Sequence, residues 1–433
     1  MNQLAFQLPF SPEPDELELN GTFREKLAIL LTGDLDFHDK ASGYASHNFH
    51  AFPAKFPPQL PRTFIKGLTN PGDIVLDPMM GSGTTVVEAL LAGRLGMGFD
   101  IDPLALQLCE VKVTRLPIDQ LVQVGGQVLE RATCAVQKQN VALVQVLEKR
   151  FDPKTRDFIN YWFQSETQIE LLALIAEIEQ VADSSIRAFL ELVFSAVIIT
   201  KSGGVSLARD LAHTRPHKVK DKVPRSALVQ FKKRFQQNLN SLSELPWGEG
   251  QIEIRYGDAQ ALPLAEAAVD LIVTSPPYAA NAIDYMRAHK FSLIWLGYPI
   301  DDLSQRRKEY IGGEAVNDFG FVSLPDETAR VVSMIGARDA KKGRVLHRYY
   351  SEMTRSLQEM FRVLKPGTAA IVVVGTSTMR GMDTRTQDCL ADIGEAIGFE
   401  VVDIATRQLD RDRRMMPARR GRKSSSQIEE RMH

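Results

Sequence analysis

The sequence predicts an α/β protein whose parallel sheet is interrupted by a large helical insertion between its second and third strands. A strand, a glycine-rich loop, a helix and a second strand follow one another within residues 71–100. About 150 residues with helical apolar spacing then precede the next strand, which is too long a stretch for a loop. Alternation of helix, turn and strand resumes at residues 349–405, as in sheets that helices cover on both faces.

Periodicity and turn residues predict the elements in order. The first unit consists of strand 74–76, loop 77–83, helix 84–91 and strand 95–99. Beyond the insertion we expect strands at 252–254, 269–273, 369–374 and 400–405, and helices at 284–296, 349–364 and 386–397. The polar stretch that ends near residue 344 contains Gly312, Gly313 and Gly320 and is predicted to be a mobile loop.

The insertion is predicted to be helical and basic. Residues 158–175 and 186–199 have the apolar spacing of buried helices. Residues 201–235 hold ten Lys or Arg against two acids, and residues 411–423 hold seven against one, although the net charge is -2. Such blocks are typical of surfaces that meet phosphate and predict a salt-dependent DNA affinity. We expect an N-terminal arm at 1–45, a catalytic domain in two parts at 46–115 and 251–433, and an insertion at 116–250 as a candidate for DNA recognition.

The 433 residues have an ordinary globular composition, 44% hydrophobic and 24% charged, which excludes disordered and fibrous classes. The three cysteines form no CxxC pair or Cys/His cluster, so we expect neither disulfides nor a metal ion. The sequence has no apolar stretch long enough to span a membrane and no signal-peptide pattern. We therefore expect a cytoplasmic protein that does not associate with membranes.

A nucleotide-type cofactor site is predicted where the first strand ends. Asp77 begins a loop that reads Asp-Pro-Met-Met-Gly-Ser-Gly-Thr, in which glycines let a ligand approach the backbone at a helix N-terminus. The loop has no lysine, so it is not a Walker A loop, and its two glycines are not a full dinucleotide fingerprint. An acid at this position would repel a pyrophosphate and attract a cation, which favours S-adenosylmethionine as the cofactor.

Two further acids follow later strands. Asp100 ends the second strand, where a carboxylate can accept hydrogen bonds from ribose hydroxyls. Asp258 follows the third strand, where it can accept from an adenine amine. Each alone could be a turn or capping residue, but acids at three consecutive strand ends favour one cofactor site.

The sequence Thr-Ser-Pro-Pro-Tyr directly follows the strand at 269–273. Pro276 and Pro277 fix the backbone and remove two amide donors, which leaves carbonyl acceptors beside Ser275 and Tyr278. Acceptance of both N–H groups of an exocyclic base amine would localise its lone pair for attack on a methyl sulfonium, while Tyr278 stacks on the flipped base. The alternative is a rigid turn with a core tyrosine.

With these motifs the sequence resembles the amino-group DNA methyltransferases, which modify cytosine N4 or adenine N6 and carry DPxxGSGT and (S/D/N)PP(Y/F) signatures. The resemblance covers residues 47–115 and 251–433 and implies a Rossmann-like sheet that depends on S-adenosylmethionine. It implies that the catalytic motif is Ser275, Pro276, Pro277 and Tyr278. It also implies a cofactor pocket formed by Phe56, Asp77, Pro78, Gly81, Ser82, Gly83, Thr84, Asp100 and Asp258.

A serine at the first position of the catalytic motif is the usual form for cytosine N4 in this family. The resemblance therefore implies site-specific methylation of cytosine N4 in double-stranded DNA after base flipping. The expected role is restriction–modification or DNA marking, with a cognate restriction endonuclease as a candidate partner. The alternatives are adenine-N6 methylation, RNA guanine-N2 methylation and non-catalytic DNA binding. The covalent cytosine-C5 route needs a thiolate, and no cysteine lies near the motif in the sequence.

Basic residues outside the cofactor motifs are expected to contact DNA. Arg287, His289 and Lys290 follow the catalytic motif and are predicted to contact phosphates around the flipped nucleotide. The further candidates are Lys218, Lys220, Arg419 and Arg420. Family sheets end in a two-stranded hairpin, but only one strand is evident here, so we expect a missing final strand and an exposed sheet edge near residue 400.

Overall fold

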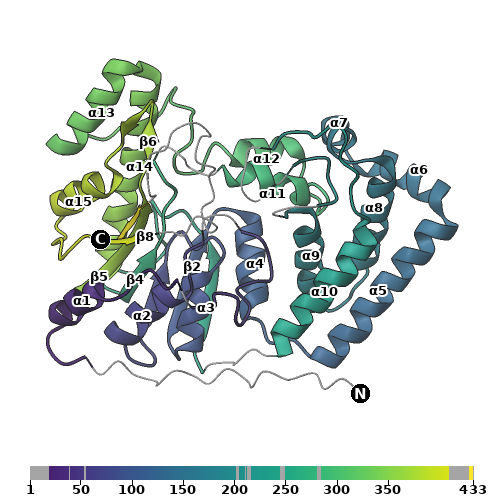
Figure 1. Cartoon of the computed structure of the whole chain (residues 1–433), viewed down its shortest axis with the longest axis horizontal. Helices are drawn as coiled ribbons and strands as arrows, with labels where there is room; N and C mark the ends of the chain where they lie inside the picture. Colours follow the sequence, from purple (N-terminus) through teal and green to yellow (C-terminus); the bar gives the residue numbers. More distant parts are fainter. Residues whose placement is uncertain are drawn as a thin grey trace.

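A seven-stranded sheet lies beside a helical lobe (Figure 1). The computed structural model describes residues 19–38, 40–52, 55–200, 204–209, 211, 216–243, 249–279, 284–408 and 429–432. The strands are β1 (Ile74–Asp77), β2 (Leu95–Asp100), β3 (Gln251–Tyr256), β4 (Val269–Thr274), β5 (Leu364–Gly375), β8 (Ala405–Gln408) and β9 (Glu429–Met432). Their order is β3-β2-β1-β4-β5-β9-β8, and the first five are parallel. The predicted α/β fold with an insertion between its second and third strands is confirmed.

Residue alternation along the strands divides the sheet between two cores. Val75 and Leu271 belong to the core beneath α1 (Phe23–Thr32) and α2 (Gln59–Leu68). Leu76 and Ile272 face the opposite core, which α13 (Asp326–Arg338), α14 (Ala340–Val363) and α15 (Thr386–Ile397) cover. Both faces of the central strands are therefore buried, which fixes the sheet between two helical layers.

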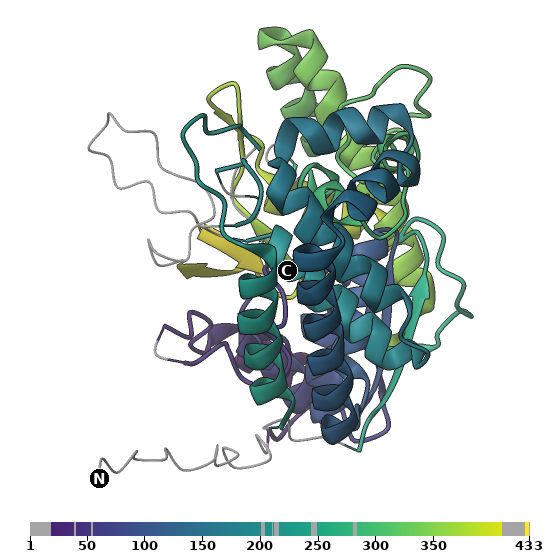
Figure 2. The same ribbon diagram turned by 90° about the vertical axis from the view of Figure 1, so that its right-hand side faces the viewer.

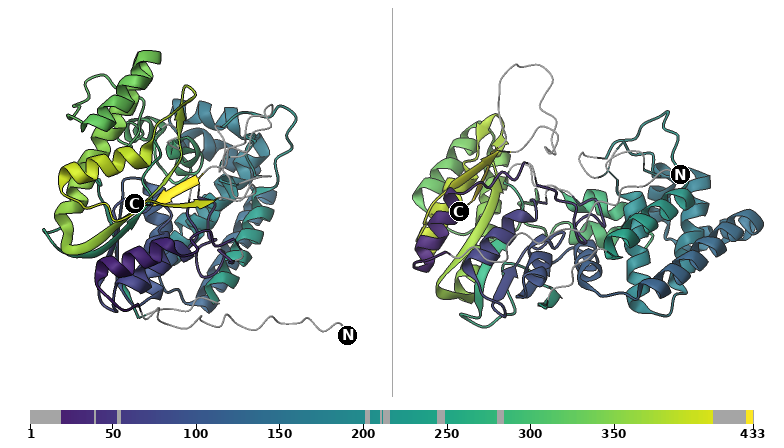
Figure 3. Two further views of the ribbon diagram at one scale, coloured as in Figure 1. Left: turned by 60° about the vertical axis from the view of Figure 1, so that its left-hand side comes forward. Right: turned by 60° about the horizontal axis from the view of Figure 1, so that its bottom comes forward.

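The sheet has a C-terminal hairpin. β9 pairs antiparallel with β5 on one side and with β8 on the other, and both strands lie together in Figure 3. The expectation of a missing final strand is therefore wrong, and β8 is the edge strand at this end of the described sheet. The strand was not evident in the sequence because its four residues, Glu-Glu-Arg-Met, lack the apolar alternation that marks a half-buried strand.

The predicted N-terminal arm contains a helix. Thr22 caps α1 in a reciprocal capping box with Glu25. Leu27, Leu30 and Leu31 of α1 are buried against the sheet core. Residues 23–32 are therefore part of the sheet domain rather than an irregular arm.

Between β2 and β3 the chain forms seven helices among the described residues. They are α4 (Pro103–Val113), α5 (Ile118–Lys138), α6 (Asn140–Arg150), α7 (Pro153–Trp162), α8 (Ser165–Glu179), α9 (Ser184–Ile198) and α10 (Ala227–Ser243). Figure 2 shows α5 and α10 side by side on the outer face of this lobe.

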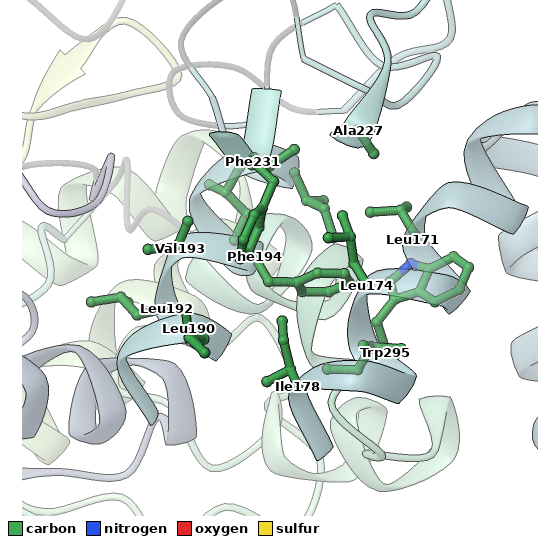
Figure 4. Close-up of a cluster of buried hydrophobic side chains, with 14 of the residues drawn as sticks. Leu171, Leu174, Ile178, Leu190, Leu192, Val193, Phe194, Ala227, Phe231 and Trp295 are labelled. Carbon is green, nitrogen blue, oxygen red and sulfur yellow. The ribbon is translucent and has the colours of Figure 1, made fainter. Parts of the chain in front are cut away.

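Residues that follow β4 in the chain also belong to the core of the helical lobe. Helices α11 (Tyr285–Leu293) and α12 (Ile300–Arg306) lie in the stretch after the predicted catalytic motif. Trp295, between them, is fully buried among Leu171, Leu174 and Ile178 of α8 (Figure 4). The insertion is therefore packed against the catalytic-motif segment. The polar stretch expected to be a mobile loop also contains α12 and α13.

None of the described helices combines the length and apolarity that crossing a membrane requires.

Replacement of Phe231 by alanine should destabilise the helical lobe. The Phe231 ring is fully buried and stacks on Phe235, with centroids 6.3 Å apart. Loss of the ring leaves a cavity, so we expect the free energy of unfolding in urea to fall by about 3–5 kcal/mol. Val229→Ala on the same helix is the control, because Val229 is 62% exposed. Equal stabilities of the two variants would contradict the assigned core.

Candidate active site

A cavity of about 650 Å³ lies at the carboxyl ends of β1, β2, β3 and β4. The strand order reverses between β1 and β4, so the loops after these strands diverge and leave a crevice between them. Phe52 and Tyr285 stack on each other in its wall, with ring centroids 5.2 Å apart. Residues 308–315, which we call the strap, form a further part of the wall.

The structure brings most of the residues predicted for the cofactor and the catalytic motif to this cavity. Those that line it are Phe56, Asp77, Pro78, Gly81, Ser82, Thr84, Asp100, Asp258, Ser275 and Pro277. Gly83, Pro276 and Tyr278 lie beside the lining residues in the same loops and do not form the cavity surface.

Asp77 presents a buried carboxyl group at the end of β1. Its Oδ1 accepts hydrogen bonds from Thr274 Oγ1 at 2.7 Å and from the backbone N–H of Met79 at 3.2 Å. Burial raises the pKa of Asp77 to about 6, and these hydrogen bonds oppose the rise. A cation in the cavity would offset the cost of ionising this group.

Asp100 links two loops. Its Oδ2 accepts from the backbone N–H of Gly81 at 2.9 Å, and its Oδ1 accepts from that of Asp102 at 2.8 Å. Burial, together with the nearby Asp102 carboxylate, raises the pKa of Asp100 to about 7. The Asp100 carboxylate therefore fixes the glycine loop relative to the β2 loop, and its remaining lone pairs can still accept from a ligand.

The glycine loop permits close packing on both sides. Gly83 has a φ of +73°, and a Cβ atom there would collide with Cys109 Sγ. The ammonium of Lys112, which is buried below the loop, donates a hydrogen bond to the backbone carbonyl of Ser82. Burial lowers the pKa of Lys112 to about 7.

The catalytic motif forms the corner after β4. Ser275 and Pro277 face the cavity, whereas Pro276 is buried. Tyr278 packs against Gly375 at the end of β5, where a Cβ atom would lie 2.6 Å from Tyr278 Cε2. The absence of a side chain at position 375 therefore makes room for the Tyr278 ring.

Asp102 is the centre of a buried cluster that the sequence reasoning missed. His289 Nδ1 lies 2.6 Å from Asp102 Oδ2, and the Tyr310 hydroxyl donates to the same oxygen at 2.8 Å. Asp102 also caps α4 by accepting from the N–H of Leu104. The Asp-Pro pair at residues 102–103 was a readable helix-start signal, but nothing in the sequence pairs it with His289 or Tyr310.

His289 does not fit its predicted DNA contact. Its side chain has no exposed surface, and it lies between Asp102 and the ring of Phe52. A phosphate cannot reach the imidazole in this arrangement, so the predicted DNA contact of His289 is wrong. His289 is a buried partner of Asp102.

The other predicted DNA contacts lie at separate places. Arg287 lines the cavity, with its Nε 2.8 Å from Asp284 Oδ2. Lys290 is partly buried over the ring of Phe158. Lys218 and Lys220 are exposed on the helical lobe, away from the cavity lining. Arg419 and Arg420 lie outside the described residues.

The cavity is electrostatically divided. Carboxyl groups gather at the strand ends, on Asp77, Asp100, Asp102 and Asp258. Cationic side chains line the wall that α11, the end of α12, the strap and α14 provide, on Arg287, Arg307, Lys308 and Lys342. The geometry can hold a cationic ligand at the sheet and an anionic one at the opposite wall.

Comparison with known proteins finds methyltransferases. Residues 33–110 match a family model described as DNA methylase, of the N6/N4 type. The chain is 24% identical to the Type II methyltransferase M.MvaI of Kocuria varians, over 80% of each protein. It is 22% identical to the Type II methyltransferase M.BsoBI of Geobacillus stearothermophilus, over 92% of this chain and 87% of that one.

Among solved structures, the rRNA methyltransferase AviRa of Streptomyces viridochromogenes aligns with 81% of this chain and 86% of its own. The sequence identity is 15% and the TM-score is 0.28.

Binding of S-adenosylmethionine, the cofactor expected from the sequence, should weaken as the pH falls. A cation binds best when Asp100 is ionised, and the raised pKa of about 7 means that this carboxyl becomes protonated below that pH. We expect affinity measured by calorimetry to fall by up to about tenfold from pH 8 to pH 6. Asp100→Asn should bind weakly and retain only the smaller dependence that Asp77, with a pKa of about 6, contributes near pH 6.

Asp73→Asn serves as the control, since Asp73 lies at the opposite end of β1, outside the cavity lining. An affinity of the unmodified protein that stays constant from pH 8 to pH 6 would contradict the assignment.

Proposed function

We propose that this chain, which belongs to an amino-group DNA methyltransferase family, transfers a methyl group to the N4 atom of cytosine in a specific sequence of duplex DNA. The methyltransferase relatives imply S-adenosylmethionine as the methyl donor. The observation that carries the proposal is the cavity that strand-end acids, Ser275 and Pro277 of the catalytic motif, and a cationic wall line together.

The cavity suits this cofactor. Its volume of about 650 Å³ is within the range of small-molecule sites. Asp77, Asp100 and Asp258 supply acceptors for an ammonium, ribose hydroxyls and an adenine amine, as proposed from their positions at the strand ends. When bound, S-adenosylmethionine would supply a methyl group on a sulfonium. The C–S bond would break as the N–C bond forms, the neutral thioether would leave without help from an acid, and the amine would lose its proton to water.

The residues of the chain would act on the base. We propose that Ser275 and the Pro276 carbonyl accept the two N–H groups of an exocyclic amine, which would keep the nitrogen lone pair out of the ring π system. Tyr278 would stack on the base after it leaves the duplex. The buried strand end and the proline pair hold this corner before the DNA arrives, so little reorganisation is needed.

Cytosine N4 is favoured over adenine N6 by the serine at position 275, which is the usual form for cytosine in the family that the sequence resembles. We propose a restriction–modification or DNA-marking role, as the Type II names of the relatives suggest. A cognate endonuclease would then recognise the same DNA sequence.

The base identity has a direct test. DNA incubated with the enzyme and S-adenosylmethionine should yield N4-methylcytosine when its nucleosides are analysed by mass spectrometry. Single-molecule sequencing of the same DNA should place the modified base in one sequence context. N6-methyladenine as the product would refute the proposed target and retain the family.

Ser275→Ala should separate catalysis from cofactor binding. Loss of one acceptor for the amine should lower the rate of methyl transfer by about two to three orders of magnitude. Affinity for S-adenosylhomocysteine should stay within about twofold, since we assign Ser275 to the base. Ser333→Ala, at an exposed position of α13, should behave like the unmodified enzyme. Full activity of Ser275→Ala would contradict the proposal that Ser275 accepts a hydrogen bond from the base amine.

A further inference from the structure

The cationic wall of the cavity contains more positive charge than its own acids neutralise. It carries Arg287 from α11, Arg307 at the end of α12, Lys308 from the strap and Lys342 from α14. The carboxylates of this wall that line the cavity are those of Asp284 and Glu314. Arg348 of α14 also lines the cavity, but its charge is matched by Glu352 of the same helix. The other four cations of the wall therefore face two anions, which favours an anionic ligand.

Arg287 and Arg307 are fixed by one shared acid. Arg287 Nε lies 2.8 Å from Asp284 Oδ2, and Arg307 Nη2 lies 2.5 Å from the same oxygen. One carboxylate cannot neutralise two guanidinium groups, but it can hold both in place. The arginine side chains remain 31% and 47% exposed, so their other N–H groups can reach a ligand.

The strap is fixed by a buried ion pair below it. Arg348 and Glu352 of α14 are 5% and 2% exposed and pair through Nε and Oε1 at 2.8 Å. Arg348 Nη2 donates to the carbonyl of Lys308 at 2.9 Å, and Glu352 Oε2 accepts from the N–H of Gly312 at 2.7 Å. The backbone of Lys308 is therefore held in place without any ligand, which lowers the entropic cost of binding one.

Lys342 completes the wall from α14. Its Nζ lies 3.0 Å from Glu314 Oε1, whose side chain is 64% exposed. An ion pair this exposed contributes little and exchanges easily for another anion. Lys342 can therefore turn from Glu314 to a ligand at small cost.

We infer that Arg287, Arg307, Lys308 and Lys342 form an anion subsite for the phosphodiester that flanks the nucleotide entering the cavity. Only Arg287 of these four was expected from the sequence. The inference rests on the proposed function, because DNA is what brings phosphate to this wall. Guanidinium groups bind phosphate through two parallel N–H bonds, and the lysines add charge without a required orientation.

The test compares neighbours on the same helices. Arg307→Gln and Lys342→Gln remove subsite charges, whereas Arg306→Gln and Lys341→Gln remove charges that do not line the cavity. Binding of a labelled duplex is measured by fluorescence anisotropy over a range of salt concentrations. Binding of S-adenosylhomocysteine is measured by calorimetry in parallel.

Each subsite variant should weaken DNA binding by about tenfold at fixed salt and lower the slope of log affinity against log salt by about one. The neighbour variants should stay within about twofold of the unmodified protein, and all four should bind S-adenosylhomocysteine normally. Equal losses for Arg306→Gln and Arg307→Gln would overturn the subsite in favour of diffuse attraction.

A loss confined to S-adenosylhomocysteine binding would also overturn the inference, since the anion would then be the carboxylate of the cofactor. Failure of the proposed function gives a different result. A protein that binds DNA through this wall but transfers no methyl group would keep the subsite and refute the methylation.

Discussion

The carboxylates of Asp100 and Asp102 tie together the loops from which the cavity is built. Asp100 accepts from the glycine loop and from the backbone of Asp102. Asp102 in turn caps α4 and bonds to His289 of α11 and Tyr310 of the strap. The cofactor side and the wall side of the cavity therefore share one hydrogen-bond network.

The carboxylates at the strand ends are costly to ionise, and a bound cation would lower that cost. Asp77 is buried and Asp100 is partly buried, and the pKa values of both are raised, so ionising them without a cation nearby is costly. Groups in this condition gain most from an incoming cation. On the opposite wall, two guanidinium groups share Asp284, which leaves positive charge for an anion. One half of the cavity is therefore negatively charged and the other positively charged, which suits a cationic cofactor beside a polyanionic substrate.

The apolar core of the helical lobe holds the lobe against the segment that carries the catalytic motif. The insertion leaves the sheet after β2, yet its core contains Trp295 from the segment after β4. The same segment carries Arg287 and begins a few residues after Tyr278. The lobe and the catalytic corner are therefore positioned relative to each other by apolar burial, and a ligand held by the lobe would sit at a defined place over the cavity.

The sequence by itself determined the parallel strands of the sheet and the cofactor edge. The helices at 84–91 and 386–397 were predicted with the bounds that the structure has, because strong periodicity and glycine or turn residues mark both ends. The acids at the strand ends were also readable, since parallel strands bring their carboxyl ends to one edge. Only the tertiary structure decided what depends on contacts distant in sequence. It buried His289 against Asp102, paired β9 with β5, and assembled the cationic wall from α11, α12, the strap and α14. The physical reason is that hydrogen bonds and charge pairs between distant segments leave no local pattern, whereas burial along a strand or helix repeats with its period.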